Sequence, residues 1–217
     1  MINTVLFDMD GLLLDTESLW GLSMWAVADK HNIRIAPDRF AETTGLRIHQ
    51  VTEHWARHYP WQGADANAVA EEILDDIIER AKTHGRIMPG VEKLLTQLED
   101  AGFRIGLASS SPSRMIEALL RHYNLWDRFR SVVSAEGLEW GKPHPAVFLK
   151  CAEELEAKPF ECLVLEDSVN GCIAGKAALM KVVAVVEERN WEDPRFAIAD
   201  LKIRSLEDLR LEKIGLM

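Results

Sequence analysis

The chain has 217 residues, of which 47% are hydrophobic, with 25 Lys and Arg against 35 Asp and Glu. This length and apolar content suit one folded domain, or one domain that carries an insertion, and exclude a disordered chain. The net charge of −10 argues against a protein that binds nucleic acids or membrane surfaces, because both functions need a basic face.

Five short apolar segments predict β-strands, at residues 4–7, 103–108, 131–134, 162–165 and 182–186. They are almost continuously apolar, which is typical of parallel strands covered by helices on both faces. Helical spacing of apolar residues lies between the later strands, at 89–101, 112–123, 145–155 and 168–179. The alternation predicts an α/β fold with a doubly wound, Rossmann-like parallel sheet.

About ninety residues separate the first strand from the second, which is far too many for one crossover helix. Within this stretch the apolar pattern predicts helices at 17–31, 48–58 and 66–82. We therefore expect a Rossmann-like catalytic core formed by residues 1–15 and 85–217, with an inserted helical cap domain over residues 16–84.

Polar residues follow four of the predicted strands: Asp8 and Asp10, then Ser109 to Ser111, then Lys142, and then Glu166 with Asp167. Each alone is compatible with an ordinary turn or helix cap. Ligands, however, bind outside the carboxyl ends of the strands in an open parallel sheet, so these residues should share one rim. Neighbouring carboxylates raise one another's pKa unless a cation compensates them. We therefore expect a hard divalent ion with oxygen ligands, preferably Mg²⁺.

In order along the chain, these residues resemble the four motifs of the haloacid dehalogenase superfamily. The matching segments are Asp8-Met9-Asp10-Gly11, Ser109, Lys142 in GKPHP, and LEDSVNG at 165–171. The helical insertion after the first motif resembles the C1 cap of the sugar-phosphate phosphatases and β-phosphoglucomutases of that superfamily. TGLR at 44–47 and ASSSP at 108–112 are similar, more narrowly, to segments of bacterial hexose-, hexitol- and 2-deoxyglucose-6-phosphate phosphatases.

The resemblance implies a Mg²⁺-dependent phosphatase of small hexose or hexitol phosphates. Asp8 would be the nucleophile that forms an aspartyl-phosphate, and Asp10 would be the general acid and base. Ser109, Ser110 and Lys142 would bind the phosphate. Mg²⁺ would be held by Asp8, by the backbone carbonyl of Asp10 and by Asp167, with Glu166 orienting a metal-bound water.

The cap would select the substrate. The resemblance implies that Arg47 contacts distal groups of the sugar phosphate. Glu17 and Trp20 lie on the first predicted cap helix, near the hinge, where we expect them to face the sugar. In the β-phosphoglucomutases that this chain resembles, a histidine occupies the position of Trp20. This difference argues against mutase activity.

Two alternatives stay open: a β-phosphoglucomutase-like phosphotransferase and, from another class, a Mg²⁺-binding receiver-like signalling module. The module would have no use for Asp10 as an acid or for the cap. The expected partner is a small phosphorylated metabolite, not nucleic acid or a membrane, and we expect a monomer. Three cysteines without a CxxC pair, and no signal-peptide pattern, predict a cytoplasmic protein. The sequence leaves open which sugar phosphate is the substrate and whether the metal is Mg²⁺ or Mn²⁺.

Overall fold

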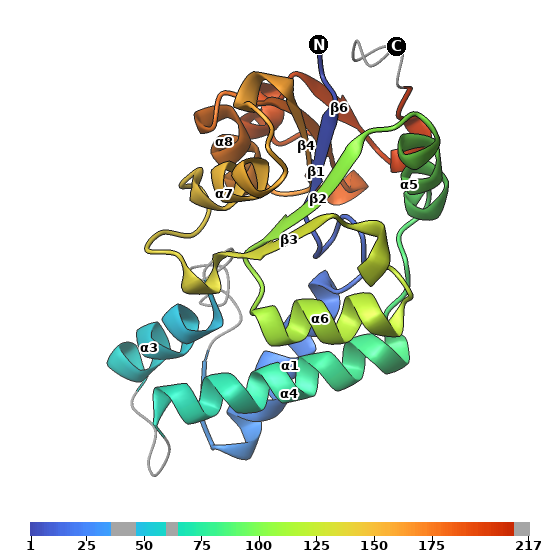
Figure 1. The fold of residues 1–217 in the computed structure, drawn as a ribbon. Coiled ribbons are helices and arrows are strands. Elements are labelled where there is room, and N and C mark those ends of the chain that lie inside the picture. Colours follow the sequence, from blue (N-terminus) through green and yellow to red (C-terminus); the bar gives the residue numbers. More distant parts are fainter. Residues whose placement is uncertain (36–46, 60–64, 211–217) are drawn as a thin grey trace.

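The computed structural model describes residues 1–35, 47–59 and 65–210 (Figure 1). Six parallel strands form one sheet in the order β3-β2-β1-β4-β5-β6. The strands are β1 (Thr4–Phe7), β2 (Arg104–Ser109), β3 (Ser131–Ser134), β4 (Cys162–Glu166), β5 (Lys181–Val185) and β6 (Leu201–Ile203). The strand order runs outward in both directions from β1, so the predicted doubly wound α/β fold is confirmed. The edge strand β6 was not predicted, because its three residues include Lys202 and form no apolar run.

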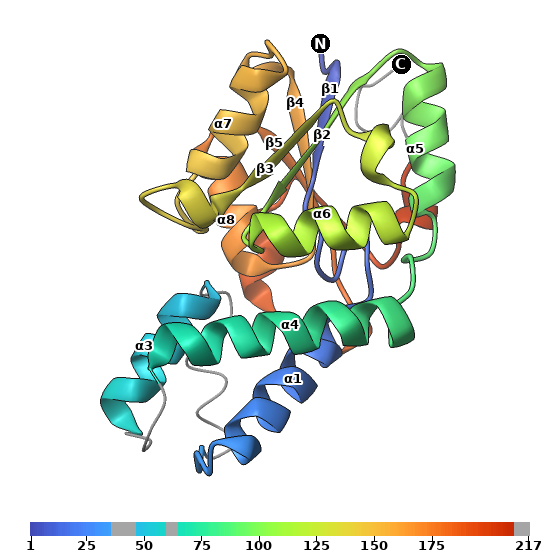
Figure 2. The same ribbon diagram turned by 60° about the horizontal axis from the view of Figure 1, so that its bottom comes forward.

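Helices cover both faces of the sheet, and the strand residues alternate between the two layers. On one face Val5, Phe7 and Leu107 pack with α5 (Val91–Asp100) and α6 (Ser113–His122). On the other face Leu6 and Val164 pack with α7 (Ala146–Glu154) and α8 (Val169–Ala177). Figure 2 shows α7 and α8 on the side of the sheet opposite α5. Burial on both faces explains why the strands read as continuous apolar runs.

The three helices predicted between β1 and β2 are present: α1 (Glu17–Lys30), α3 (Ile48–His58) and α4 (Ala66–His84). They share an apolar cluster in which Trp55 is fully buried against Val51 and Ile73. The second half of α4 continues into the main core, where Ile77 packs in the same cluster as α6. The helices lie together beyond the carboxyl end of β1 (Figures 1 and 2). The division into core and cap at residues 15 and 85 stays a prediction.

Within the described part of the chain, no helix combines the length and the apolar character needed to cross a membrane. The three cysteines are free and buried, and burial raises the pKa of the Cys151 thiol to about 12. They therefore pack as small apolar side chains. Residues 44–46 of the TGLR segment lie outside the described residues.

Candidate active site

Lys142 stands at the centre of a buried ion-pair cluster at the carboxyl ends of β1, β2 and β4. Its Nζ donates to Asp8 Oδ1 at 2.5 Å, to Glu166 Oε1 at 2.6 Å and to the Ala108 carbonyl oxygen at 3.0 Å. All three donors of the ammonium group are thereby used. Burial alone would lower the pKa of Lys142, but the carboxylates of Asp8 and Glu166 outweigh it and raise that pKa above its ordinary value. Lys142 is therefore held as a cation.

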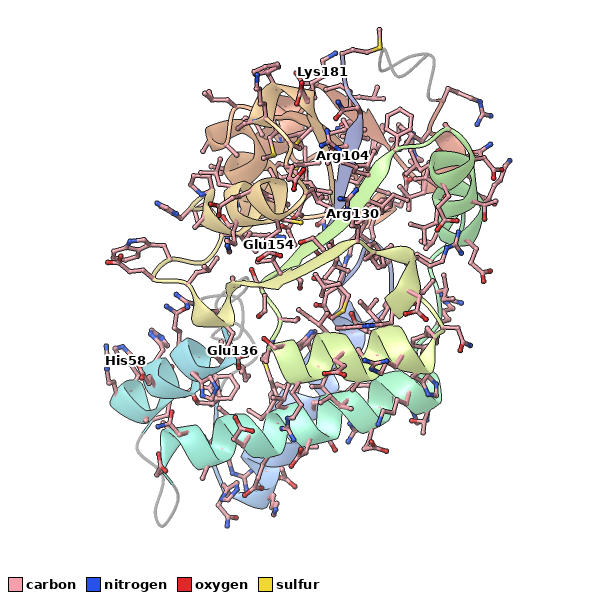
Figure 3. The ribbon with its side chains drawn as sticks, viewed as in Figure 1. His58, Arg104, Arg130, Glu136, Glu154 and Lys181 are labelled. Atoms are coloured by element: carbon pink, nitrogen blue, oxygen red, sulfur yellow. The ribbon has the colours of Figure 1, made fainter. Side chains whose placement is uncertain are left out.

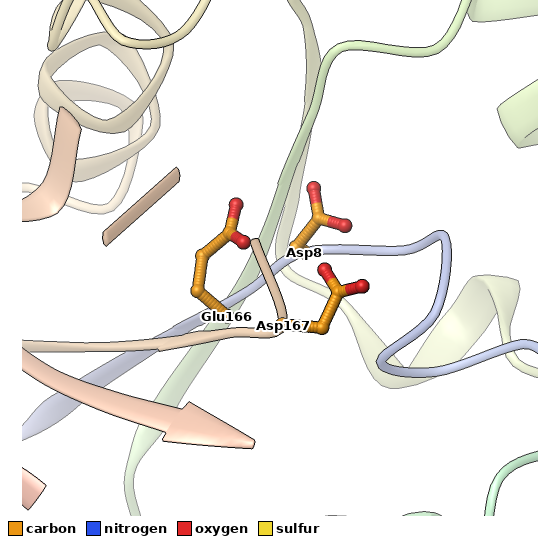
Figure 4. A group of neighbouring side chains, drawn as sticks. All are labelled: Asp8, Glu166 and Asp167. Carbon is orange, nitrogen blue, oxygen red and sulfur yellow. The ribbon is translucent and has the colours of Figure 1, made fainter. Parts of the chain in front are cut away.

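Three acidic side chains share this cluster. Asp8, Glu166 and Asp167 offer carboxylate oxygens that all lie within 4.8 Å of one another (Figure 4). Burial raises the pKa of Asp8 to about 8, with Lys142 opposing the rise and Glu166 and Asp10 adding to it. Burial, followed by the charges of Glu166 and Asp8, also raises the pKa of Asp167. One ammonium group cannot neutralise three carboxylates, so the donor set fits a hard divalent cation with oxygen ligands.

Glu166 and Asp167 differ in how their oxygens are used. Glu166 Oε2 accepts bonds from the backbone N–H and the hydroxyl of Ser168, each at 2.9 Å, while its Oε1 accepts from Lys142. Among the described residues, no protein donor bonds to the Asp167 carboxylate. Asp167 is thus available to a cation, whereas Glu166 is already bound by protein groups on both oxygens.

Two glycines make room for these carboxylates. A methyl group on Gly171 would lie 1.7 Å from Glu166 Oε1, and one on Gly11 would lie 2.2 Å from Asp167 Oδ2. Gly11 also has a φ of +73°, which favours glycine. Both belong to the motifs quoted above, and the close approach of an acidic side chain gives the physical reason for each.

Asp10 is held from two directions. Its Oδ1 accepts bonds from Thr16 Oγ1 at 2.6 Å and from Trp20 Nε1 at 3.1 Å, and its Oδ2 accepts one from Ser111 Oγ at 2.5 Å. Sequence reasoning missed Thr16 altogether and placed Ser111 on the rim without this role. Trp20 donates its indole N–H to Asp10, and the expected contact of Trp20 with the sugar stays a prediction.

The remaining expected residues lie as follows. Ser109 ends β2, is buried, and accepts a bond from the Ser111 N–H at 3.0 Å on its Oγ, while Ser110 follows it, half-buried. Glu17, at the start of α1, pairs with Arg189 at 3.2 Å. Partial burial raises the pKa of Glu17, with Arg189 opposing and Asp10 adding to the rise.

Arg47 is the residue that precedes α3, and its guanidinium binds main-chain carbonyls of the core instead of entering the acidic cluster. The structure therefore brings most of the expected rim together at one edge of the sheet: Asp8, Asp10, Ser109, Lys142, Glu166 and Asp167. A substrate contact by Arg47 stays a prediction.

Comparison with known proteins shows to which family the chain belongs. Over 209 residues the chain is 39% identical to hexitol phosphatase B of Escherichia coli K12, and this match covers 96% of this chain and 94% of that protein. It is 30% identical to β-phosphoglucomutase of Bacillus subtilis, covering 97% of this chain and 93% of the relative. The crystal structure of CbbY from Rhodobacter sphaeroides in complex with phosphate shares the fold, with a TM-score of 0.87, 22% identity and 96% coverage of each chain. The family model of haloacid dehalogenase-like hydrolases matches residues 5–185. This chain therefore belongs to the haloacid dehalogenase-like hydrolase family.

Proposed function

We propose that this protein is a Mg²⁺-dependent phosphatase that hydrolyses phosphate monoesters of small sugars, with hexitol and hexose phosphates as the substrate class. The observation that carries the proposal is the buried cluster of Asp8, Lys142, Glu166 and Asp167, with Asp10 two residues beyond Asp8. The similarity to hexitol phosphatase B over nearly the whole chain supports the substrate class.

Asp8 is the nucleophile in this proposal. Lys142 holds its Oδ1, and no described residue donates to its Oδ2, which leaves that oxygen to attack phosphorus. The attack forms the aspartyl-phosphate and expels the sugar oxygen, and water then hydrolyses the acyl phosphate. Lys142 favours the ionised form of Asp8, since its charge opposes the rise in pKa that burial causes. The positive charge of Lys142 attracts the transferring phosphoryl group, and Ser109 and the Ser110 N–H bind its oxygens.

Asp10 serves as the acid and then as the base. It donates a proton to the departing sugar oxygen and afterwards accepts one from the attacking water. Thr16, Trp20 and Ser111 fix the carboxyl group of Asp10 by three hydrogen bonds. This fixed orientation suits proton transfer to the sugar oxygen as it leaves the phosphorus atom that Asp8 attacks.

The metal site uses the acidic cluster, in which Asp167 receives no bond from a donor among the described residues and Asp8 receives one from Lys142 on Oδ1. Asp8, Asp167 and the backbone carbonyl of Asp10 would hold Mg²⁺, and Glu166 would orient a water of its coordination shell. When bound, the ion neutralises negative charge on the carboxylates and on the phosphate.

The test is a panel assay of the purified protein. Hexitol phosphates, hexose 6-phosphates and p-nitrophenyl phosphate are offered with Mg²⁺ and again with excess EDTA, with Asp8→Asn as the inactive control. We expect phosphate release from the sugar esters that needs both Mg²⁺ and Asp8. Full activity in EDTA, or in Asp8→Asn, would contradict the proposal.

A β-phosphoglucomutase activity is the second candidate, because a β-phosphoglucomutase is 30% identical to this chain. Its test is product analysis with glucose 1-phosphate. Accumulation of glucose 6-phosphate instead of free glucose and phosphate would favour the mutase.

A further inference from the structure

Arg47 links the helical insertion to a loop of the sheet domain. Its Nη1 donates to the carbonyl oxygens of Ala135 at 3.2 Å and Leu138 at 2.8 Å, and its Nη2 donates to the carbonyl oxygen of Glu139 at 3.0 Å. These three residues belong to the loop between β3 and α7. One side chain of the insertion therefore binds three carbonyls of the main chain opposite it, and Figure 1 shows the start of α3 next to the turn after β3.

The same loop carries Lys142. Glu139 stands three residues before Lys142, and Gly141, directly before it, packs against Arg47, since a methyl group there would lie 3.4 Å from Arg47 Nε. Arg47 Nε is buried and has no hydrogen-bond partner among the described residues. The arginine side chain is thus enclosed against the backbone that leads into the buried lysine.

Both ends of the loop are anchored in the core: Ala135 and Leu138 pack in the apolar cluster that contains α7, and Lys142 makes its three buried bonds. Its first turn is tied to α6, where the Ser113 N–H donates to Glu136 Oε2 at 3.1 Å (Figure 3). Beyond that turn Glu139 and Trp140 are exposed. Within the described ranges, Arg47 is the one donor to the carbonyls of Leu138 and Glu139. The exposed stretch between Leu138 and Lys142 has few buried contacts of its own, so its conformation depends strongly on the bonds to Arg47.

We propose that Arg47 is a positioning residue that holds the 138–141 segment in the conformation that inserts Lys142 between Asp8 and Glu166. Contact of the insertion with the sheet domain is thereby coupled to the placement of the lysine. The inference rests on the proposed function, in which Lys142 acts on the phosphoryl group. It assigns Arg47 a role different from the contact with distal substrate groups that the family resemblance implies.

Arginine is suited to this role and lysine is not. The planar guanidinium spreads five N–H donors over three nitrogens in a fixed fork, so it can reach carbonyls that lie apart, whereas the three donors of an ammonium group all radiate from one nitrogen on a flexible stem. Arg47→Lys should therefore behave like Arg47→Met in its kinetics, although it keeps the charge.

The kinetic test compares Arg47→Met and Arg47→Lys with the control Arg57→Met. Arg57 lies on α3, the helix that Arg47 precedes, and its side chain is 75% exposed and pairs only with Glu53 among the described residues. Because a misplaced Lys142 affects every phosphate ester, we expect kcat to fall about tenfold or more for both a hexitol phosphate and p-nitrophenyl phosphate. The KM ratio of the two substrates should stay unchanged, and Arg57→Met should retain wild-type kinetics. A loss confined to the hexitol phosphate, or a lower Tm with normal kinetics, would overturn the inference.

A second readout does not depend on catalysis. Amide hydrogen exchange of residues 138–142 should be faster in Arg47→Met than in wild type or Arg57→Met, because the carbonyls of the loop lose their donors. Unchanged exchange in this segment would refute the positioning role even if activity fell. Absence of any phosphatase activity in the wild type would refute the proposed function, while the exchange measurement would still decide the contact.

Discussion

Replacing Gly171 with alanine sets two physical effects against each other. Gly171 is the third residue of α8, and alanine is favoured over glycine in a helix interior by about 1 kcal/mol. A methyl group at this position would, however, lie 1.7 Å from Oε1 and 1.8 Å from Cδ of Glu166, so the carboxylate has to move. The displaced carboxylate then loses its bonds to Lys142 and Ser168. Removing one partner of a buried ion pair costs about 3–5 kcal/mol. We expect the free energy of unfolding to fall by about 2–4 kcal/mol.

The assay is urea unfolding of the metal-free protein, followed by tryptophan fluorescence. Gly21→Ala is the matched control, since Gly21 lies within α1 and a methyl group there would meet no atom within 4 Å. The control should gain up to about 1 kcal/mol from helix propensity alone. If Gly171→Ala gained stability as the control does, Glu166 would not be fixed by its bonds to Lys142 and Ser168, and the predicted loss would be refuted.

Three further predictions concern the acidic cluster and Asp10. Asp8→Asn should abolish turnover while the fold is retained, because an amide is nearly isosteric with a carboxylate but does not attack phosphorus, and a variant with a tenth of wild-type activity would rule out the covalent route. The apparent Kd for Mg²⁺, measured by titration calorimetry, should fall as the pH rises toward 8. In Asp167→Asn it should be much higher than in the wild type. The affinity rises with pH because the pKa of Asp8 is raised to about 8 and that of Asp167 is also raised. Both carboxyl groups hold protons at lower pH and must release them to bind the ion. An affinity for Mg²⁺ that does not depend on pH would contradict the site. Trp20→Phe removes the indole N–H from Asp10 and should lower kcat several-fold, by about 1 kcal/mol for one hydrogen bond; normal kcat and an unchanged pH profile would show that Trp20 does not position Asp10.

The sequence alone predicted the sheet and most of its polar rim. Apolar runs such as 162–165 indicate strands buried on both faces, and parallel strands bring their carboxyl ends to one edge. The position of a residue directly after its strand therefore places it on the rim, which is how Asp8, Ser109 and Asp167 were found. The edge strand β6 was not predicted, because a strand at the exposed edge of a sheet does not need an apolar run.

The tertiary structure decided which partner each rim residue has. Lys142 and Asp8 are 134 positions apart in the sequence, and Arg47 and Leu138 are 91 apart. Local periodicity fixes which face of a helix is apolar, but it does not fix where an inserted helical segment rests on the sheet domain. The bonds of Thr16 and Trp20 to Asp10, and of Arg47 to the loop before Lys142, depend on that placement, since a hydrogen bond requires its atoms to meet within about 3 Å.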